Sequence, residues 1–236
     1  GGGGGGGTNP GPTPPPGNLT PNPGPEFLLS TDVNPQDQNT LYRSDVMGSQ
    51  GSFAAITTLD HKHKISVTDD GRLACLVGTN GHIYTIQNIA TNSPNIQQLS
   101  INPVWENAVV SKDGRRLAAV ETSVDTSVYV FDLSANPVTG VRYRLYNPTN
   151  TQGVNFSGML YADAMEFDHS GEYLAFDAFN RIPNLSGSDL TFWTIGFMQV
   201  WDNNQDDFGN GGIEMLVGQL DPGDNIGEPA FSKNSP

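Results

Sequence analysis

The stretch "AVVSKDGRRLAAVETSVDTSVYVFDLS", Ala108–Ser134, decides the fold. It contains an apolar run, an Asp-Gly pair, a second apolar run, a polar loop and a third run rich in Val, Tyr and Phe. Asp-Gly favours the positive φ angles of tight hairpin turns. Short β-branched and aromatic runs bounded by polar residues are typical of strands. The stretch therefore predicts three consecutive antiparallel strands.

The same pattern occurs in three other places. The turn recurs in four aligned segments: Val67–Gly71, Val110–Gly114, Phe167–Gly171 and Phe231–Ser235. Second strands follow as "RLACLV", "RRLAAV" and "EYLAF", third strands as "HIYTI", "SVYVFDL" and "FMQVWD", and fourth strands as "NIQQLS", "VRYRLYN" and "IEMLVG". No stretch has the 3.6-residue period of a helix. Four short antiparallel strands in each repeat predict an all-β protein, a β-propeller with three full four-stranded blades and further partial ones.

The N-terminal part fits the same pattern without its first strand. "EFLLST", "TLYRSDV" and "SFAAIT" match the second, third and fourth strands, and "EPAFS" near the C-terminus has the character of the missing one. Closed propellers commonly complete a blade with a strand from the other chain end, which removes an exposed sheet edge. Two interpretations stay open. The chain is cut at its C-terminal end from a propeller of roughly six to eight blades, or it closes as a four-bladed ring.

Two quoted segments carry a family resemblance. "FDHSGEYLAF" and "VSKDGRRLAAV…VYVFDL" resemble the WD40-like propeller repeat of TolB-type proteins, which also occurs in the propellers of prolyl-oligopeptidase-type enzymes. The resemblance covers residues 26–236 and implies a propeller domain over that range. It implies no single function, because propellers host many functions.

Residues 1–25 differ from the rest of the chain. They are dominated by Gly and Pro, with almost no apolar side chains that could offset the entropy of ordering. We expect a flexible tether, extended where prolines crowd. A glycine run with a Pro/Thr spacer resembles the tether of bacterial lipoproteins, whose lipid-bearing cysteine would immediately precede Gly1. This resemblance predicts a lipid anchor and a cell-envelope (outer-membrane) or extracellular location. A cytoplasmic location and an expression linker stay open as alternatives.

The composition excludes some partners. The 236 residues include 25 Asp and Glu against 11 Lys and Arg, a net charge of −14, so phosphate backbones and anionic lipid repel the chain. We therefore expect no nucleic-acid partner. No apolar run approaches the roughly 20 residues of a membrane-spanning helix. The sequence has no G-x-S-x-G, H-E-x-x-H or phosphate-loop motif, which favours a non-enzyme.

Extra chain length gathers around the third full blade. Two insertions, Asn147–Tyr161 and Asn180–Gly196, are predicted to lie on one rim of one face, where binding loops of rigid scaffolds are common. Aromatic side chains beside carboxylates suit a sugar, peptide or protein surface. The alternative is that the loops only cover the blade. The predicted partner-binding residues are Phe156, Tyr161, Phe179, Phe192 and Trp193.

The stretch "DNNQDDFGNGGIE", Asp202–Glu214, suggests a metal site. Alternating oxygen donors on a tight loop are how calcium loops collect hard ligands. The pattern departs from the helix-loop-helix motif at two positions, since Asp207 replaces a glycine and Glu214 is one residue late. The predicted calcium ligands are Asp202, Asn204, Asp206, Asp207 and Glu214, and the alternative is a solvated acidic loop.

Three functions fit these observations. The first is a non-catalytic cell-envelope propeller that binds a protein partner or an extracellular polymer such as a polysaccharide. The second is the propeller domain of a larger prolyl-oligopeptidase-like hydrolase, whose catalytic domain would follow Pro236. The third is a TolB-like periplasmic assembly factor. The full-length gene would separate the first two, because the hydrolase needs a nucleophile elbow downstream.

Overall fold

The computed structural model describes residues 27–30, 40–45, 54–89, 91, 93–123, 126–146, 158–182, 187–217 and 226–231. The predicted tether, residues 1–25, and the predicted contact residue Phe156 lie outside these ranges. All regular elements of the described residues are strands.

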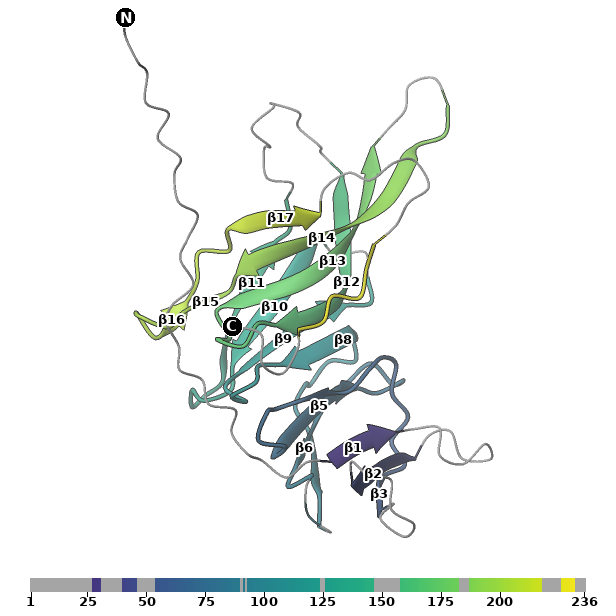
Figure 1. Ribbon diagram of the computed structural model, residues 1–236, viewed down its shortest axis with the longest axis vertical. Coiled ribbons are helices and arrows are strands. Elements are labelled where there is room, and N and C mark those ends of the chain that lie inside the picture. Colours follow the sequence, from purple (N-terminus) through teal and green to yellow (C-terminus); the bar gives the residue numbers. More distant parts are fainter. Residues whose placement is uncertain are drawn as a thin grey trace, which may run out of the picture.

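Four antiparallel sheets follow one another along the chain (Figure 1). The N-terminal sheet has three strands: β1 (Phe27–Ser30), β2 (Leu41–Asp45) and β3 (Ala54–Thr57). The first blade is made of β4 (Ser66–Val67), β5 (Leu73–Val77), β6 (Ile83–Gln87) and β7 (Asn95–Gln98). The second blade is made of β8 (Trp105–Val110), β9 (Arg116–Glu121), β10 (Ser127–Asp132) and β11 (Thr139–Arg144).

The third blade is made of β12 (Met159–Phe167), β13 (Tyr173–Ile182), β14 (Leu190–Gln199) and β17 (Ile213–Val217). A small hairpin of β15 (Trp201–Asp202) and β16 (Asp207–Phe208) lies between β14 and β17. The three complete sheets and the three-stranded N-terminal sheet confirm the predicted all-β propeller with four-stranded antiparallel blades.

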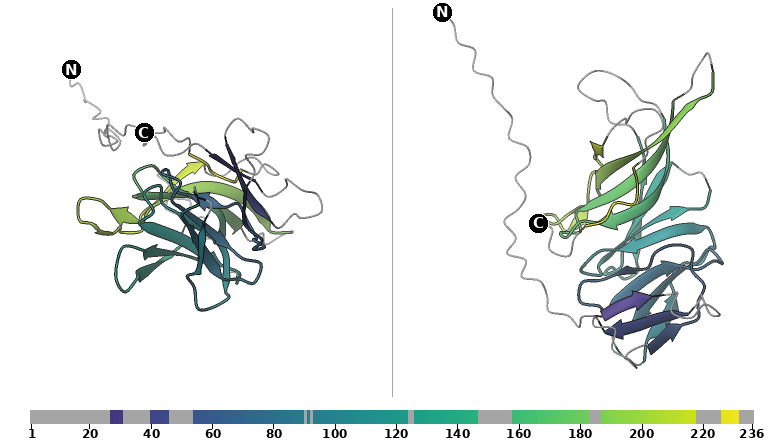
Figure 2. Two further views of the ribbon diagram at one scale, coloured as in Figure 1. Left: turned by 90° about the horizontal axis from the view of Figure 1, so that it is seen from below. Right: turned by 45° about the vertical axis from the view of Figure 1, so that its right-hand side comes forward.

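The sheets stack face to face, as Figure 2 shows from the side. In β5, Ala74 and Leu76 belong to the core shared with the N-terminal sheet, whereas Cys75 and Val77 belong to the core shared with the second blade. Successive strand residues point to opposite faces, so a strand with neighbours on both sides is apolar throughout. This explains the continuous run "LACLV". Burial raises the pKa of the Cys75 thiol to about 12, as expected for a core residue.

Each turn between first and second strands is closed by one hydroxyl and one carboxylate. In the second blade, the Ser111 hydroxyl donates to the Asp113 carboxylate, which also accepts a hydrogen bond from the backbone N–H of Arg115 at 3.0 Å. The same two residue types close the other turns: Thr68 with Asp70, and Ser170 with Asp168. Side chains that hydrogen-bond to nearby backbone favour turns over continued strand.

A glycine ends each of these turns. Gly71, Gly114 and Gly171 have φ angles of 63°, 76° and 71°, in the left-handed region that glycine adopts most easily. The repeated Asp-Gly and Ser-Gly pairs are therefore required by backbone geometry.

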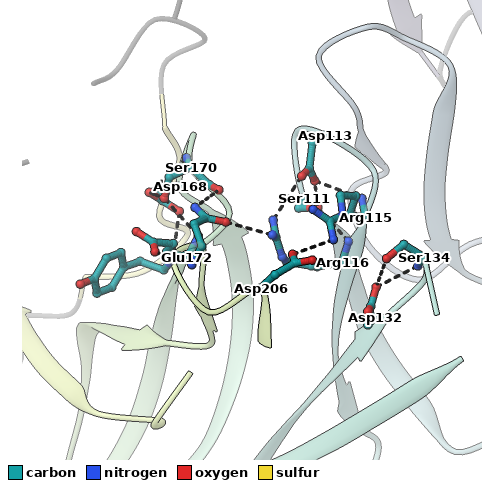
Figure 3. A network of polar contacts seen from close by, with 12 residues as sticks. Ser111, Asp113, Arg115, Arg116, Asp132, Ser134, Asp168, Ser170, Glu172 and Asp206 are labelled. Carbon is teal, nitrogen blue, oxygen red and sulfur yellow. Dashed lines mark hydrogen bonds and ion pairs between the residues drawn. The ribbon is translucent and has the colours of Figure 1, made fainter. Parts of the chain in front are cut away.

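A buried arginine joins the second blade to the β15–β16 hairpin (Figure 3). The Arg116 side chain is 1 % exposed and donates to Asp113 at 3.2 Å and to Asn203 at 3.0 Å. Its guanidinium lies 4.5 Å from the centre of the Trp201 ring. Burial lowers the pKa of Arg116. The neighbouring Arg115 pairs with Asp206 at 2.9 Å, which adds a second contact between the same two elements.

Two predicted segments are placed differently by the structure. Asn180–Gly196 is not an insertion loop, because β13 and β14 pair without interruption from Tyr173↔Gln199 to Ile182↔Leu190. Trp201-Asp202 was predicted to end the third strand, but it pairs with β16 in a separate hairpin. In that hairpin the Trp201 ring packs against Arg116 and Phe208.

The prediction that "EPAFS" completes the N-terminal blade is wrong for its described residues. Glu228 N–H donates to the Asp177 carboxylate at 3.0 Å, and Phe231 N–H donates to the Glu166 carboxylate at 3.0 Å. The segment 226–231 therefore runs beside the third blade, where Figure 1 shows it as a yellow trace next to β12. Acceptors on β12 and β13 hold it there.

Candidate functional site

The third blade is longer than the second. The repeat aligns Ala119 with Phe176, and these residues pair with Tyr129 and Gly196 respectively. Beyond Phe176↔Gly196, β13 and β14 continue for six further pairs, to Ile182↔Leu190. The paired strand ends at residues 179–182 and 190–193, called the protruding hairpin below, extend past the other sheets (Figures 1 and 2).

Three predicted contact residues meet at the base of this hairpin. Tyr161 on β12 lies opposite Phe179 on β13, which lies opposite Trp193 on β14. Directly opposed residues point to the same face of a sheet. The Tyr161 and Phe179 rings stack at 5.3 Å, and Trp193 lies 5.3 Å from Phe179 and 5.8 Å from Tyr161. All three side chains are partly exposed. They are called the aromatic triad below.

Phe192 does not belong to the triad. It is 6 % exposed and lies opposite Asn180, one position along the strand from Trp193, so it points to the other face of the sheet. Asn180 is also buried and donates to the Ala178 carbonyl at 2.8 Å and the Thr194 hydroxyl at 2.9 Å. The face of the hairpin that carries Phe192 and Asn180 is therefore buried and contributes to the packing of the third blade.

A buried carboxylate lies on the same face as the triad. Asp177 is 4 % exposed and accepts hydrogen bonds from the backbone N–H groups of Asp163 at 3.2 Å, Ala164 at 2.7 Å and Glu228 at 3.0 Å. Burial raises the pKa of Asp177 and outweighs these hydrogen bonds, which lower it. The carboxylate supports the irregular part of β12 and holds segment 226–231 in place.

The predicted calcium ligands are used in other ways. Asp202 accepts from the backbone N–H groups of Asn204 at 2.9 Å and Gln205 at 3.2 Å, and Asp206 pairs with Arg115 at 2.9 Å. Asp207 accepts from its neighbour Phe208, and Glu214 lies on β17 opposite Phe197. Across the described ranges, no three His, Cys, Asp or Glu side chains gather as metal ligands would. Calcium binding stays a prediction.

The sequence interpretation did not find a cavity of about 400 Å³ at the edge of the second blade. The described residues that line it are Thr126, Ser127, Arg142 and Arg144. The alternation in "VRYRLYN" was a usable signal, because residues two apart on a strand share a face. The sequence does not reveal that the start of β10 lies beside the end of β11, which brings Ser127 next to Arg144.

The solved structures that resemble this chain include β-propellers, and their sequence identities to it are low. No family model and no curated protein matches the chain. Among solved structures, TolB from Acinetobacter baumannii is 15 % identical with a TM-score of 0.46, covering 75 % of this chain and 37 % of TolB. This chain therefore spans little more than a third of the TolB chain.

Two proteases give similar results. The tricorn protease is 12 % identical with a TM-score of 0.40, over 80 % of this chain and 18 % of the protease. The β-propeller domain of the Trilobed protease from Pyrococcus furiosus, described as having an open velcro topology, is 10 % identical with a TM-score of 0.43, over 82 % and 53 %. The repeated four-stranded sheets of this chain carry the assignment of the propeller fold. Within the described residues, no helix is long and apolar enough to cross a membrane.

Proposed function

We propose that this chain is a non-catalytic binding module that holds a protein partner or an extracellular polymer at the protruding hairpin. The observation that carries the proposal is the aromatic triad of Tyr161, Phe179 and Trp193, which is partly exposed where the third blade outgrows its neighbour. Stacked, partly exposed aromatics on rigid strands offer a large contact area with little loss of side-chain freedom on binding.

We also propose a location on the cell envelope. The support is residues 1–25, whose Gly- and Pro-rich composition resembles a lipoprotein tether and would hold the propeller away from a surface. Sequencing the gene upstream of Gly1 tests this proposal. A signal peptide that ends in a lipid-acceptor cysteine just before Gly1 would support it. An upstream protein sequence without any signal peptide would contradict it.

A photo-crosslinking amino acid at Thr191 tests the binding site. Thr191 is exposed on the protruding hairpin, whereas the control position Val138, 45 % exposed, lies in the β10–β11 connection at the opposite end of the strands. When the variants are irradiated in the cells that naturally make this protein, the probe at Thr191 should form one defined crosslinked product with the partner. The probe at Val138 should form none.

Trp193→Ala then separates binding from structural cover. If the triad binds the partner, this variant keeps its fold and loses the Thr191 adduct, with partner affinity at least about tenfold weaker. If the triad only covers the blade, the adduct persists and the free energy of unfolding falls by about 3–5 kcal/mol. The second outcome would contradict the proposal.

A further inference from the structure

The cavity at the edge of the second blade brings two arginines to one face. In the β10–β11 pair, Ser127 lies opposite Arg144 and Tyr129 lies opposite Arg142. Tyr143, between the two arginines, points the other way and is buried against the third blade. The two guanidinium groups therefore extend from the same side of β11, and the Thr126 and Ser127 side chains line the cavity with them.

One of these arginines is positioned by its neighbours. Arg142 Nε donates to the Ser127 hydroxyl at 2.9 Å, and its guanidinium lies 5.7 Å from the centre of the Tyr129 ring. Ser127 is 1 % exposed, so this anchor is itself buried. Arg144 is exposed, and its side chain makes no ion pair or hydrogen bond with another residue in the described part of the chain. The cavity thus combines an oriented guanidinium with an available one.

The charge around the cavity is unusual for this protein. The chain carries 25 acidic and 11 basic residues, yet no described acidic side chain lines this cavity. The exposed guanidinium of Arg144 is a planar donor that suits a carboxylate. β11 is also an edge strand, where charges discourage pairing with other chains. Discouraging such pairing requires neither a cavity nor the buried Ser127 hydroxyl that orients Arg142.

We propose that this cavity binds one unit of an acidic sugar, free or within a polysaccharide. The planar carboxylate fits the fork of Arg144, with Arg142 beside it, and a sugar hydroxyl fits the partly exposed Thr126. A volume of about 400 Å³ suits a small ligand. The inference rests on the proposed function, since it names an acidic polysaccharide as the polymer. It uses no residue of the protruding hairpin.

The two sites share one end of the molecule. Thr126 and Ser127 lie at the start of β10, and the corresponding start of β14 belongs to the protruding hairpin. Arg144 ends β11, and the next strand along the chain, β12, carries Tyr161.

The test is a titration of the full chain with short oligogalacturonates, followed by NMR. Amide signals of Thr126, Ser127 and Arg144 should shift with the acidic oligomer. Neutral galacto-oligosaccharides should bind at least about tenfold more weakly, because they lack the carboxylate. Polyglutamate and inorganic phosphate distinguish a sugar site from a general anion site. Equal binding of either probe at these residues, or no binding of oligogalacturonate, would overturn the proposal.

Matched arginine variants complete the test. Arg144→Gln should bind oligogalacturonate at least about tenfold more weakly. Arg72→Gln, which removes the same charge at a side chain 84 % exposed in the first blade, should bind as the native chain does. Arg144→Lys keeps the charge but loses the fork, so its affinity should fall between them. Unchanged binding in Arg144→Gln, or equal losses in both Gln variants, would overturn the proposal.

The Thr191 crosslink separates the two proposals. If it survives in Arg144→Gln while oligogalacturonate binding is lost, the hairpin and the cavity hold different ligand groups, and the cavity inference stands. If the native chain gives no crosslink but binds oligogalacturonate through Arg144, the hairpin proposal fails and the cavity inference stands.

Discussion

At the scale of single residues, the turns are the most predictable part of the protein. The hydroxyl, carboxylate and glycine of each turn are close in sequence, so local chemistry is sufficient to identify them. The burial of Arg116 was not predictable, because "GRRLAAV" looks like a solvated turn followed by a strand. Its burial depends on Asn203 and Trp201, which are far away in sequence.

Two glycine substitutions separate local strain from this long-range contact. Gly114→Ala should lower the free energy of unfolding by about 1–2 kcal/mol, since φ is +76° and the new Cβ meets only Thr68 Cγ2 at 3.2 Å and Leu73 Cδ2 at 3.6 Å. Gly171→Ala, at φ +71°, places Cβ 2.6 Å from Arg116 Nη1. Displacing that group weakens its hydrogen bonds, so about 1 kcal/mol more should be lost. Urea unfolding of both variants measures the difference, and equal losses would contradict the role of Arg116.

At the scale of strands and hairpins, the sequence indicated the right region for a partly wrong reason. Residues between Asn180 and Asp189 include Pro, Gly, Ser and Asn, which are typical of loops, so the insertion was predicted as irregular. Those residues lie between the strands, whereas residues 180–182 and 190–196 of the predicted insertion belong to β13 and β14, where each strand supplies the other's hydrogen bonds. Tyr161, Phe179 and Trp193 consequently meet across strands, an arrangement that loop composition does not predict.

The β15–β16 hairpin offers a test of the calcium prediction. The Asp206–Arg115 ion pair is largely exposed, so its loss should cost less than about 1 kcal/mol. Alanine at the Asp206 φ angle of 51° adds a strain that is the same with and without calcium. To bind calcium, the Asp206 carboxylate would have to give up its ion pair with Arg115. We expect Asp206→Ala to lower the melting temperature by the same small amount in calcium and in chelator. Arg115→Gln is the matched control, because it removes the same ion pair without removing an oxygen ligand. A larger decrease for Asp206→Ala in calcium alone would establish a calcium site.

At the scale of the whole molecule, polar contacts join the first strands of the second and third blades to lysines that flank the first strand of the preceding blade. Lys62 pairs with Glu106 at 2.7 Å, and Lys112 pairs with Glu166 at 2.7 Å. Glu166 also accepts the N–H of Phe231, the residue that the repeat aligns with the end of a first strand. Phe231 thus lies beside β12, and its place in a fourth repeat stays a prediction because residues 232–236 lie outside the described ranges. The partner of that segment depends on Asp177 and Glu166, which composition alone does not identify.

Asp177 makes this arrangement sensitive to pH. Because burial raises its pKa in the folded chain above the usual 3.8, the folded state keeps a proton that the unfolded state has released. Stability therefore falls as pH rises from about 3.8 through the folded pKa, and stays lower above it. Asp177→Asn removes this dependence. Asn keeps only one accepting oxygen. If that oxygen stays with the N–H groups of Asp163 and Ala164, the NH2 group faces the Glu228 N–H and cannot accept from it, so segment 226–231 should also become easier to cleave by protease at every pH.

Glu106 supplies a control of opposite sign. Burial alone would raise the pKa of Glu106, but hydrogen bonds from Lys62 and His63 lower it overall, so its contribution to stability is lost as pH falls. Urea unfolding across acidic to neutral pH should give two difference curves. The stability of the native chain relative to Asp177→Asn should decrease with rising pH, whereas its stability relative to Glu106→Gln should increase. A flat curve for Asp177→Asn would mean that the buried carboxylate ionises as easily in the folded chain as in the unfolded one. The hydrogen bonds from Asp163, Ala164 and Glu228 would then fully offset its burial.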